Sequence, residues 1–134
     1  MKRRTALRTF GSAAVIGGAG CLGGGGSNGP KEVRMVDLQF EPAEFSIQAG
    51  RTVRWVNESD IGHTVTAYET QLPDGADYWA SGGFETEEAA RTNLADGLIN
   101  ADGTYRHTFE TAGDHAYFCV PHEGSGMTGT VSVQ

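Results

Sequence analysis

The sequence predicts an all-β domain, a sandwich or barrel of short antiparallel strands. From about residue 31 onward, short runs of alternating apolar and polar residues follow one another, which is typical of strands that bury one face. Glycine-containing turns at Ala49-Gly50, Ala112-Gly113 and Gly124-Ser125-Gly126 separate several of these runs. Many short strands joined by such turns favour a two-sheet architecture.

The runs expected as strands cover residues 33–40, 45–47, 52–57, 63–66, 104–110, 114–120 and 127–133. In the run 52–57, Val53 and Trp55 point one way and Thr52 and Arg54 the other, so we expect Trp55 in the core.

The stretch between residues 68 and 103 is less regular. Helix-forming residues with acids at the front predict one short helix over 85–91. The acidic residues Glu85, Glu87 and Glu88 would form its solvated face, with a docking patch as the alternative. We find no internal repeat and no second domain, so residues 31–134 are expected to fold as one unit.

Charge is strongly asymmetric along the chain. The 134 residues include 17 acidic and 10 basic ones, a formal charge of −7. Four of the basic residues (Lys2, Arg3, Arg4 and Arg8) lie in the first ten positions, so the rest of the chain is strongly acidic. Such a surface disfavours nucleic acid and favours basic partners or a salt-rich solvent.

The first 20 residues have the features of an export signal. A basic segment with the pair Arg3-Arg4 precedes a mild, glycine- and alanine-rich stretch over 10–19. That stretch is too short and too weakly apolar to span a bilayer. Residues 1–20 are therefore predicted to be a Tat-type lipoprotein signal peptide.

Cys21 is predicted to carry a lipid. The sequence Gly18-Ala19-Gly20-Cys21 resembles a lipobox, and a glycine-rich linker follows up to Pro30. A cysteine before such a spacer has no packing role. The alternatives are a disulfide between Cys21 and Cys119, or a tail without lipid.

Four residues form a candidate metal site. Cys119, His122 and Met127 follow the spacing C-x2-H-x4-M, and His63 lies far upstream at the start of an expected strand. Thiolate and thioether favour Cu(I), whereas imidazole suits both oxidation states of copper. This set predicts a single copper ion.

The remaining histidines and methionines do not favour other metal-dependent functions. A copper enzyme would need further paired histidines, and only His107 and His115 remain. His107 alternates with Tyr105 and Phe109, so it should share their strand face, and neither spare histidine is expected to bind metal. Copper storage would need a richer methionine and histidine supply, and bound zinc would be redox-silent.

Two segments carry a family resemblance. Residues 117–131 (YFCVPHEGSGMTGTV) resemble the ligand loop of plastocyanin-type blue copper proteins, and residues 50–57 followed by His63 resemble the segment that brings their first histidine. When the lipobox-like anchor and the acidity are considered along with these two segments, the chain most resembles the halocyanins, which are membrane-attached cupredoxins of salt-loving archaea. The resemblance implies a cupredoxin-like Greek-key β-sandwich, with one short helix in a long insertion.

The resemblance also implies the function. His63, Cys119, His122 and Met127 would hold one type 1 copper ion in a monomeric one-electron carrier that is not an enzyme and has no small-molecule substrate. Its partners would be redox proteins of a membrane respiratory chain. With lipid at Cys21, the protein would lie on the outer face of the cell membrane.

The chain departs from the family pattern at two places. Thr64 stands where many relatives have an asparagine that pins the cysteine loop, and we expect its hydroxyl to do a similar job. The 68–103 segment is longer than in the plant proteins. The ring edge of His122 is the expected electron port, and Gly124, Gly126 and Gly129 should allow close approach of a partner.

Overall fold

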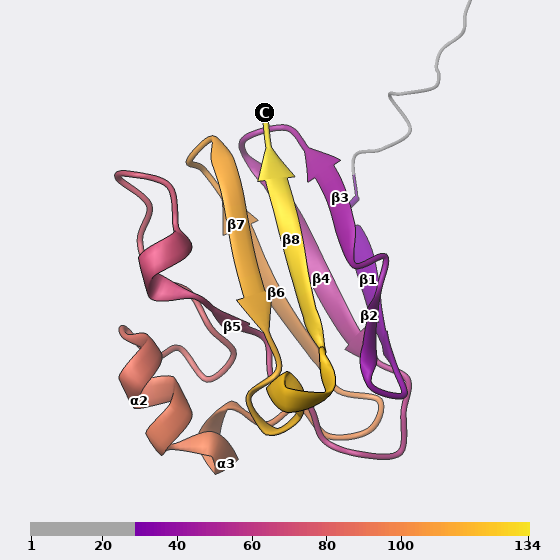
Figure 1. Ribbon diagram of the computed structural model, residues 1–134. Coiled ribbons are helices and arrows are strands. Elements are labelled where there is room, and N and C mark those ends of the chain that lie inside the picture. Colours follow the sequence, from indigo (N-terminus) through magenta and orange to yellow (C-terminus); the bar gives the residue numbers. More distant parts are fainter. Residues whose placement is uncertain (1–28) are drawn as a thin grey trace, which may run out of the picture. The chain divides into compact units, whose positions relative to one another are not determined.

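The computed structural model describes residues 29–134, and the signal, lipobox and most of the linker lie outside the described residues. Residues Lys31–Gln134 form one compact unit. It contains two four-stranded sheets (Figure 1). The strands are β1 (Lys31–Val36), β2 (Gln39–Glu41), β3 (Glu44–Ile47), β4 (Arg51–Asn57), β5 (Thr66–Ala67), β6 (Thr104–Phe109), β7 (Gly113–Phe118) and β8 (Thr128–Val133).

The sheets have the strand orders β2-β1-β4-β6 and β3-β8-β7-β5. The expectation of purely antiparallel pairing is wrong for two pairs. β1 runs parallel to β4, with Val33 opposite Trp55, and β3 runs parallel to β8, with Phe45 opposite Val131. Both pairs join strands that are not consecutive in sequence, and a parallel neighbour requires such a crossover rather than a hairpin.

The core lies between the inward faces of the two sheets. Val53 and Trp55 are fully buried, as the alternation in β4 predicts. Trp79, from the 68–103 segment, stacks on Trp55 with ring centroids 5.6 Å apart. Tyr117 of the other sheet meets Trp55 edge-on at 5.4 Å. Aromatic contacts of this kind add to the burial of apolar area, so the segment outside the sheets completes the core.

The 68–103 segment contains two α-helices where one was expected. α2 (Glu87–Thr92) begins after Thr86, whose hydroxyl accepts a hydrogen bond from Ala89 N–H, a normal N-cap. α3 (Leu94–Gly97) follows directly, and a 3₁₀ turn, η1 (Glu69–Gln71), precedes them. Figure 1 shows both helices on the side of the molecule where β5 lies, and α2 contacts β5. Within residues 29–134, no helix is long and apolar enough to cross a membrane.

A second 3₁₀ segment, η2 (Val120–Ser125), joins β7 to β8. Figure 1 shows it at the end of the sandwich opposite the C-terminus. The segment ends at Gly126, whose φ of 87° lies in the left-handed region that favours glycine. This turn sends the chain back into β8 within a few residues, and it positions the predicted ligands.

Candidate metal centre

The four predicted ligands come from two separate parts of the fold. Cys119 directly follows β7, His122 lies within η2, and Met127 directly precedes β8. His63 lies before β5, in an isolated bridge with Ile99 rather than in the strand expected over 63–66. The bridge is two-way: His63 N–H donates to Ile99 C=O (3.1 Å) and Ile99 N–H donates to His63 C=O (2.7 Å).

Three of these side chains converge. The possible ligand atoms of His63, Cys119 and His122 all lie within 4.8 Å of one another. The sulfur of Cys119 lies 3.6 Å from His63 Nδ1 and 3.3 Å from His122 Nδ1. Cys119 and His63 are fully buried, and His122 is partly exposed. A thiol and two imidazoles that face one another in this way form a donor set for a soft or borderline metal ion.

Met127 is fully buried in the same loop. Its carbonyl accepts a hydrogen bond from Cys119 N–H (3.0 Å), and its N–H donates to His122 C=O (3.3 Å). These bonds close the turn, so the backbone at Cys119, His122 and Met127 is tied together independently of any metal.

Two residues orient the His63 ring, and sequence reasoning missed both. Ser59 Oγ lies 2.8 Å from His63 Nε2, which leaves Nδ1 to face Cys119. Ser59 Oγ also donates to Asn57 Oδ1 (2.7 Å), and Asn57 Nδ2 donates to the carbonyls of Ile61 and Ile99. The sequence contained a sign of the role of Asn57, because Asn57 is a polar residue at the end of the buried face that carries Val53 and Trp55.

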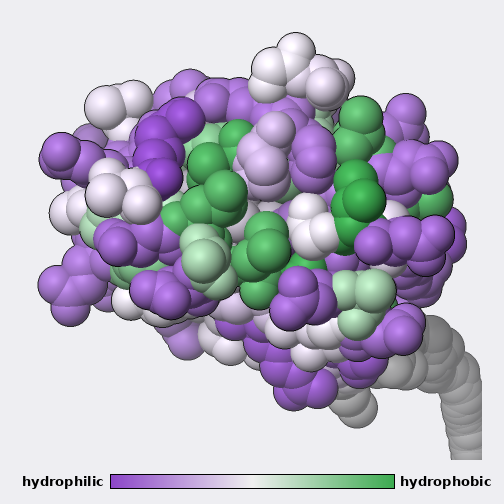
Figure 2. All heavy atoms as spheres, turned by 90° about the horizontal axis from the view of Figure 1, so that it is seen from below, coloured by the Kyte–Doolittle hydropathy of each residue, from purple (hydrophilic) through white to green (hydrophobic). Residues whose placement is uncertain are grey.

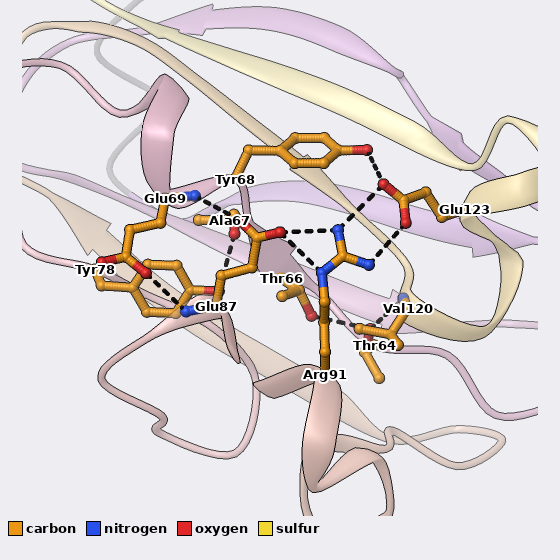
Figure 3. Close-up of polar contacts among 10 residues, drawn as sticks. All are labelled: Thr64, Thr66, Ala67, Tyr68, Glu69, Tyr78, Glu87, Arg91, Val120 and Glu123. Carbon is orange, nitrogen blue, oxygen red and sulfur yellow. Dashed lines mark hydrogen bonds and ion pairs between the residues drawn. The ribbon is translucent and has the colours of Figure 1, made fainter. Parts of the chain in front are cut away.

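Thr64 pins the cysteine loop, as predicted. Its hydroxyl accepts a hydrogen bond from Val120 N–H at 2.8 Å (Figure 3). Its own N–H points at Cys119 Sγ, 3.4 Å away. Thr66 Oγ1 supports this arrangement by donating to Thr64 Oγ1 (3.0 Å). The threonine hydroxyl therefore performs the task expected from the family's asparagine.

The electrostatic environment suits a bound cation. Burial raises the pKa of the Cys119 thiol, although the Thr64 N–H opposes this effect. Burial and, second, the proximity of His122 lower the pKa of His63, which favours the neutral imidazole that can bind a metal. A buried thiolate is unfavourable unless a positive charge offsets it, and a metal ion at this position would supply that charge.

The other two histidines lie elsewhere, in the aromatic core. His107 stacks on Trp79 (5.1 Å) and shares a face with Phe109 (4.6 Å), as its alternation predicts. His115 accepts a hydrogen bond from Trp79 Nε1 at Nδ1 (3.3 Å), and its Nε2 lies 3.0 Å from Thr111 C=O. Both ring nitrogens of His115 are occupied, so these side chains serve packing.

An apolar surface covers the end of the sandwich at which η2 lies. Figure 2, viewed toward that end, shows hydrophobic side chains gathered between polar ones. The exposed large apolar residues of the described chain are Leu38 (36%), Ile61 (44%) and Leu98 (36%). They come from three loops that Figure 1 places at this end. Exposed apolar patches with a polar rim mark interaction sites.

The expectation for the loop glycines is wrong for Gly129. Gly124 and Gly126 are exposed, but Gly129 is buried. A Cβ at Gly129 would lie 2.6 Å from Tyr117 Oη. Its lack of a side chain serves the packing of β8 on β7 rather than the approach of a partner.

Comparison with known proteins decides the family. Residues 29–134 match the family described as copper binding proteins, plastocyanin/azurin family. The chain belongs to this family. Membership confirms the expected copper and the cupredoxin fold, and plastocyanins are electron carriers rather than enzymes, in agreement with the prediction.

Among curated relatives, plastocyanin of Scenedesmus fuscus is 39% identical over 98 residues, which cover 72% of this chain and 88% of that protein. Plastocyanin of Solanum tuberosum is 34% identical over the same shares of both chains. Among solved structures, amicyanin of Paracoccus versutus is 28% identical with a TM-score of 0.56, over 78% of this chain and 81% of the amicyanin chain.

Proposed function

We propose that this cupredoxin carries one electron at a time, on a single type 1 copper ion held by His63, Cys119, His122 and Met127. The observation that carries the proposal is the convergence of the Cys119 sulfur and two imidazole nitrogens within 4.8 Å. When bound, copper would supply one-electron chemistry by alternating between Cu(II) and Cu(I).

The protein's own contribution is a site that changes little between the two states. His63 is fixed by its backbone bridge to Ile99 and by Ser59, and the loop of Cys119 is fixed by Thr64. Ligands that are already oriented need little rearrangement when charge changes. A rigid site therefore favours rapid electron transfer.

His122 is the best exit for the electron. It is the only one of the three converging side chains that is partly exposed. It belongs to η2, which Figure 1 shows at the end of the sandwich that carries the apolar surface. An apolar surface excludes water when a partner docks, without requiring the desolvation of charges. A redox protein that docks there would contact the edge of the His122 ring.

Visible spectroscopy tests this function. The copper-loaded, oxidised protein should show an intense blue thiolate-to-copper band that bleaches with one electron equivalent. Cys119→Ser should abolish the band, whereas Ser125→Ala in the same loop should retain it. A colourless Cu(II) form of the native protein would refute the electron-carrier proposal.

The proposed cellular setting rests on residues outside the described ones. The twin arginines, the lipobox-like Gly18–Cys21 segment and the glycine-rich linker support export and a lipid at Cys21. A halocyanin-like carrier, attached to the outer face of the cell membrane and serving a respiratory chain, fits these features together with the acidic domain.

Fractionation tests the anchor. Cys21→Ser should keep the blue band but move the protein from the membrane to the soluble fraction, since two acyl chains are needed for stable attachment. Arg3→Lys with Arg4→Lys should block export without affecting colour. A membrane-bound Cys21→Ser protein would contradict the anchor proposal.

A further inference from the structure

One residue links the 68–103 segment to the metal centre. Arg91, in the last turn of α2, is the only Lys or Arg between Trp55 and Tyr105. Ten acidic residues lie in the same stretch. Arg91 forms an ion pair outside this stretch, with Glu123, which lies in η2 directly after His122 (Figure 3).

The contact is bidentate. Arg91 donates from Nη1 to Glu123 Oε1 (2.9 Å) and from Nη2 to Glu123 Oε2 (3.3 Å). Two parallel bonds between a guanidinium and a carboxylate fix direction as well as distance. Single exposed ion pairs contribute little to stability, so the significance of this pair lies in its geometry and in its neighbours.

Those neighbours hold both partners in place. Arg91 Nε donates to Glu87 Oε2 (2.8 Å), and the guanidinium lies 4.3 Å above the ring of Phe118. Tyr68 Oη donates to Glu123 Oε2 (2.7 Å), and the Tyr68 ring stacks on Phe118 at 4.3 Å. Phe118 directly precedes Cys119. The network therefore contacts the chain at two points, directly before Cys119 and directly after His122.

After His122, backbone hydrogen bonds close the ligand loop, and Glu123 adds a side-chain contact to the rest of the fold. Its first residues are fixed by the Thr64–Val120 hydrogen bond. His122 has non-helical angles (φ −123°, ψ 15°), and it is followed by Glu123, Gly124, Ser125 and Gly126. Gly124 and Gly126 would have no heavy atom within 4 Å of an added Cβ, so side-chain packing does not hold this part. Glu123 is the residue there that the network holds.

We propose that Arg91 and Glu123 form a clamp that positions His122 as a metal ligand and thereby connects the insertion to copper retention. This inference rests on the proposed function. The clamp keeps the loop in its closed conformation, so the His122 ring stays directed at the Cys119 sulfur. Arg91 acts through Glu123 and is a positioning residue, not a ligand.

The test compares Arg91→Gln, Glu123→Gln and the double variant with the native protein and with Glu88→Gln. Glu88 is exposed on α2, the helix of Arg91. The Glu88→Gln control therefore loses the same negative charge as Glu123→Gln. Release of Cu(I) to excess bicinchoninate should be about tenfold faster in each clamp variant, as for losses of residues that orient metal ligands. The double variant should be no faster than either single one, because both remove one contact.

Paramagnetic proton NMR of the Cu(II) proteins gives a reading that a general loss of stability would not produce. The ring-proton resonances of His122 should shift or broaden in the clamp variants, while those of His63 stay unchanged. Equal changes at both histidines, or release rates like those of Glu88→Gln, would overturn the clamp. A colourless native protein would overturn both proposals, whereas a blue native protein with unaffected clamp variants overturns only this one.

Discussion

The hydroxyl of Thr64 accepts a hydrogen bond from the backbone N–H of Val120, directly after the metal-site cysteine, at 2.8 Å. The two residues are 56 positions apart in sequence. Through this bond, the segment that carries His63 holds the segment that carries Cys119 and His122. The two halves of the centre are thus joined by protein contacts as well as by any shared ion.

Thr64→Val should destabilise the metal-free protein by about 1–3 kcal/mol, because it leaves the Val120 N–H without its partner. Thr64→Asn, which restores an acceptor, should recover part of this loss. Urea unfolding of the metal-free variants measures both values. If Thr64→Val unfolds at the native urea concentration, the hydrogen bond contributes nothing to stability.

Ser59→Ala should weaken copper binding by about 10–100-fold, because Ser59 holds the Nε2 side of the His63 ring. Competition with a chelator of known affinity measures the change. Ser132→Ala is the matched control, since its hydroxyl donates to Asp114 in the strands and should leave affinity unchanged. Equal affinities for the two variants would mean that the backbone bridge alone orients His63.

Gly129→Ala should cost about 1–3 kcal/mol of stability through overpacking. The added Cβ would lie 2.6 Å from the buried Tyr117 Oη and 2.9 Å from Ala43 C=O. Gly124→Ala provides the control, because a Cβ there meets nothing within 4 Å. Thermal unfolding should separate the two variants clearly, and similar melting temperatures would disprove the packing role of Gly129.

The metal-free protein should lose stability as pH falls from about 6.5 toward 4. Burial, and second the proximity of His115, lower the pKa of His107 from 6.5 to about 4. The unfolded chain therefore binds a proton in this window that the folded chain excludes, so stability is greatest above it. The loss is at most about 3 kcal/mol, since each pKa unit is worth about 1.4 kcal/mol and His107 is partly accessible to solvent.

Urea titrations of the metal-free protein at pH 7 and pH 4.5 measure this dependence. His107→Phe, which can keep the stacking on Trp79, should reduce it. An unchanged difference between the two pH values in that variant would assign the dependence to other groups.

Much of the fold was predictable because its strands bury only one face. The alternation around Trp55 and the turns at Gly50 and Gly113 gave positions that the structure confirms within a few residues. The parallel pairing of β1 with β4 was not predictable, since alternation defines which face is buried but not which strand lies alongside. The second helix was missed because α3 is a single turn without a cap of its own.

The candidate site was likewise predictable only in part. Cys119, His122 and Met127 share one short loop, so local spacing brings them together. His63, in contrast, reaches the site through its pairing with Ile99, and Ser59 and Arg91 act through contacts between distant segments. Sequence patterns show local geometry directly, but they do not show contacts between loops that only the folded sheets bring together.

The C-terminus lies at the opposite end of the sandwich from η2 (Figure 1). It is fixed there, because Gln134 N–H donates to Ile47 C=O (2.8 Å) and Ala49 N–H donates to Gln134 C=O (3.3 Å). A thiol or affinity tag added after Gln134 would therefore attach the protein to an electrode with its metal-binding end directed into solution. Immobilised in that orientation, the domain would keep the apolar surface around η2 uncovered and open to a soluble redox protein.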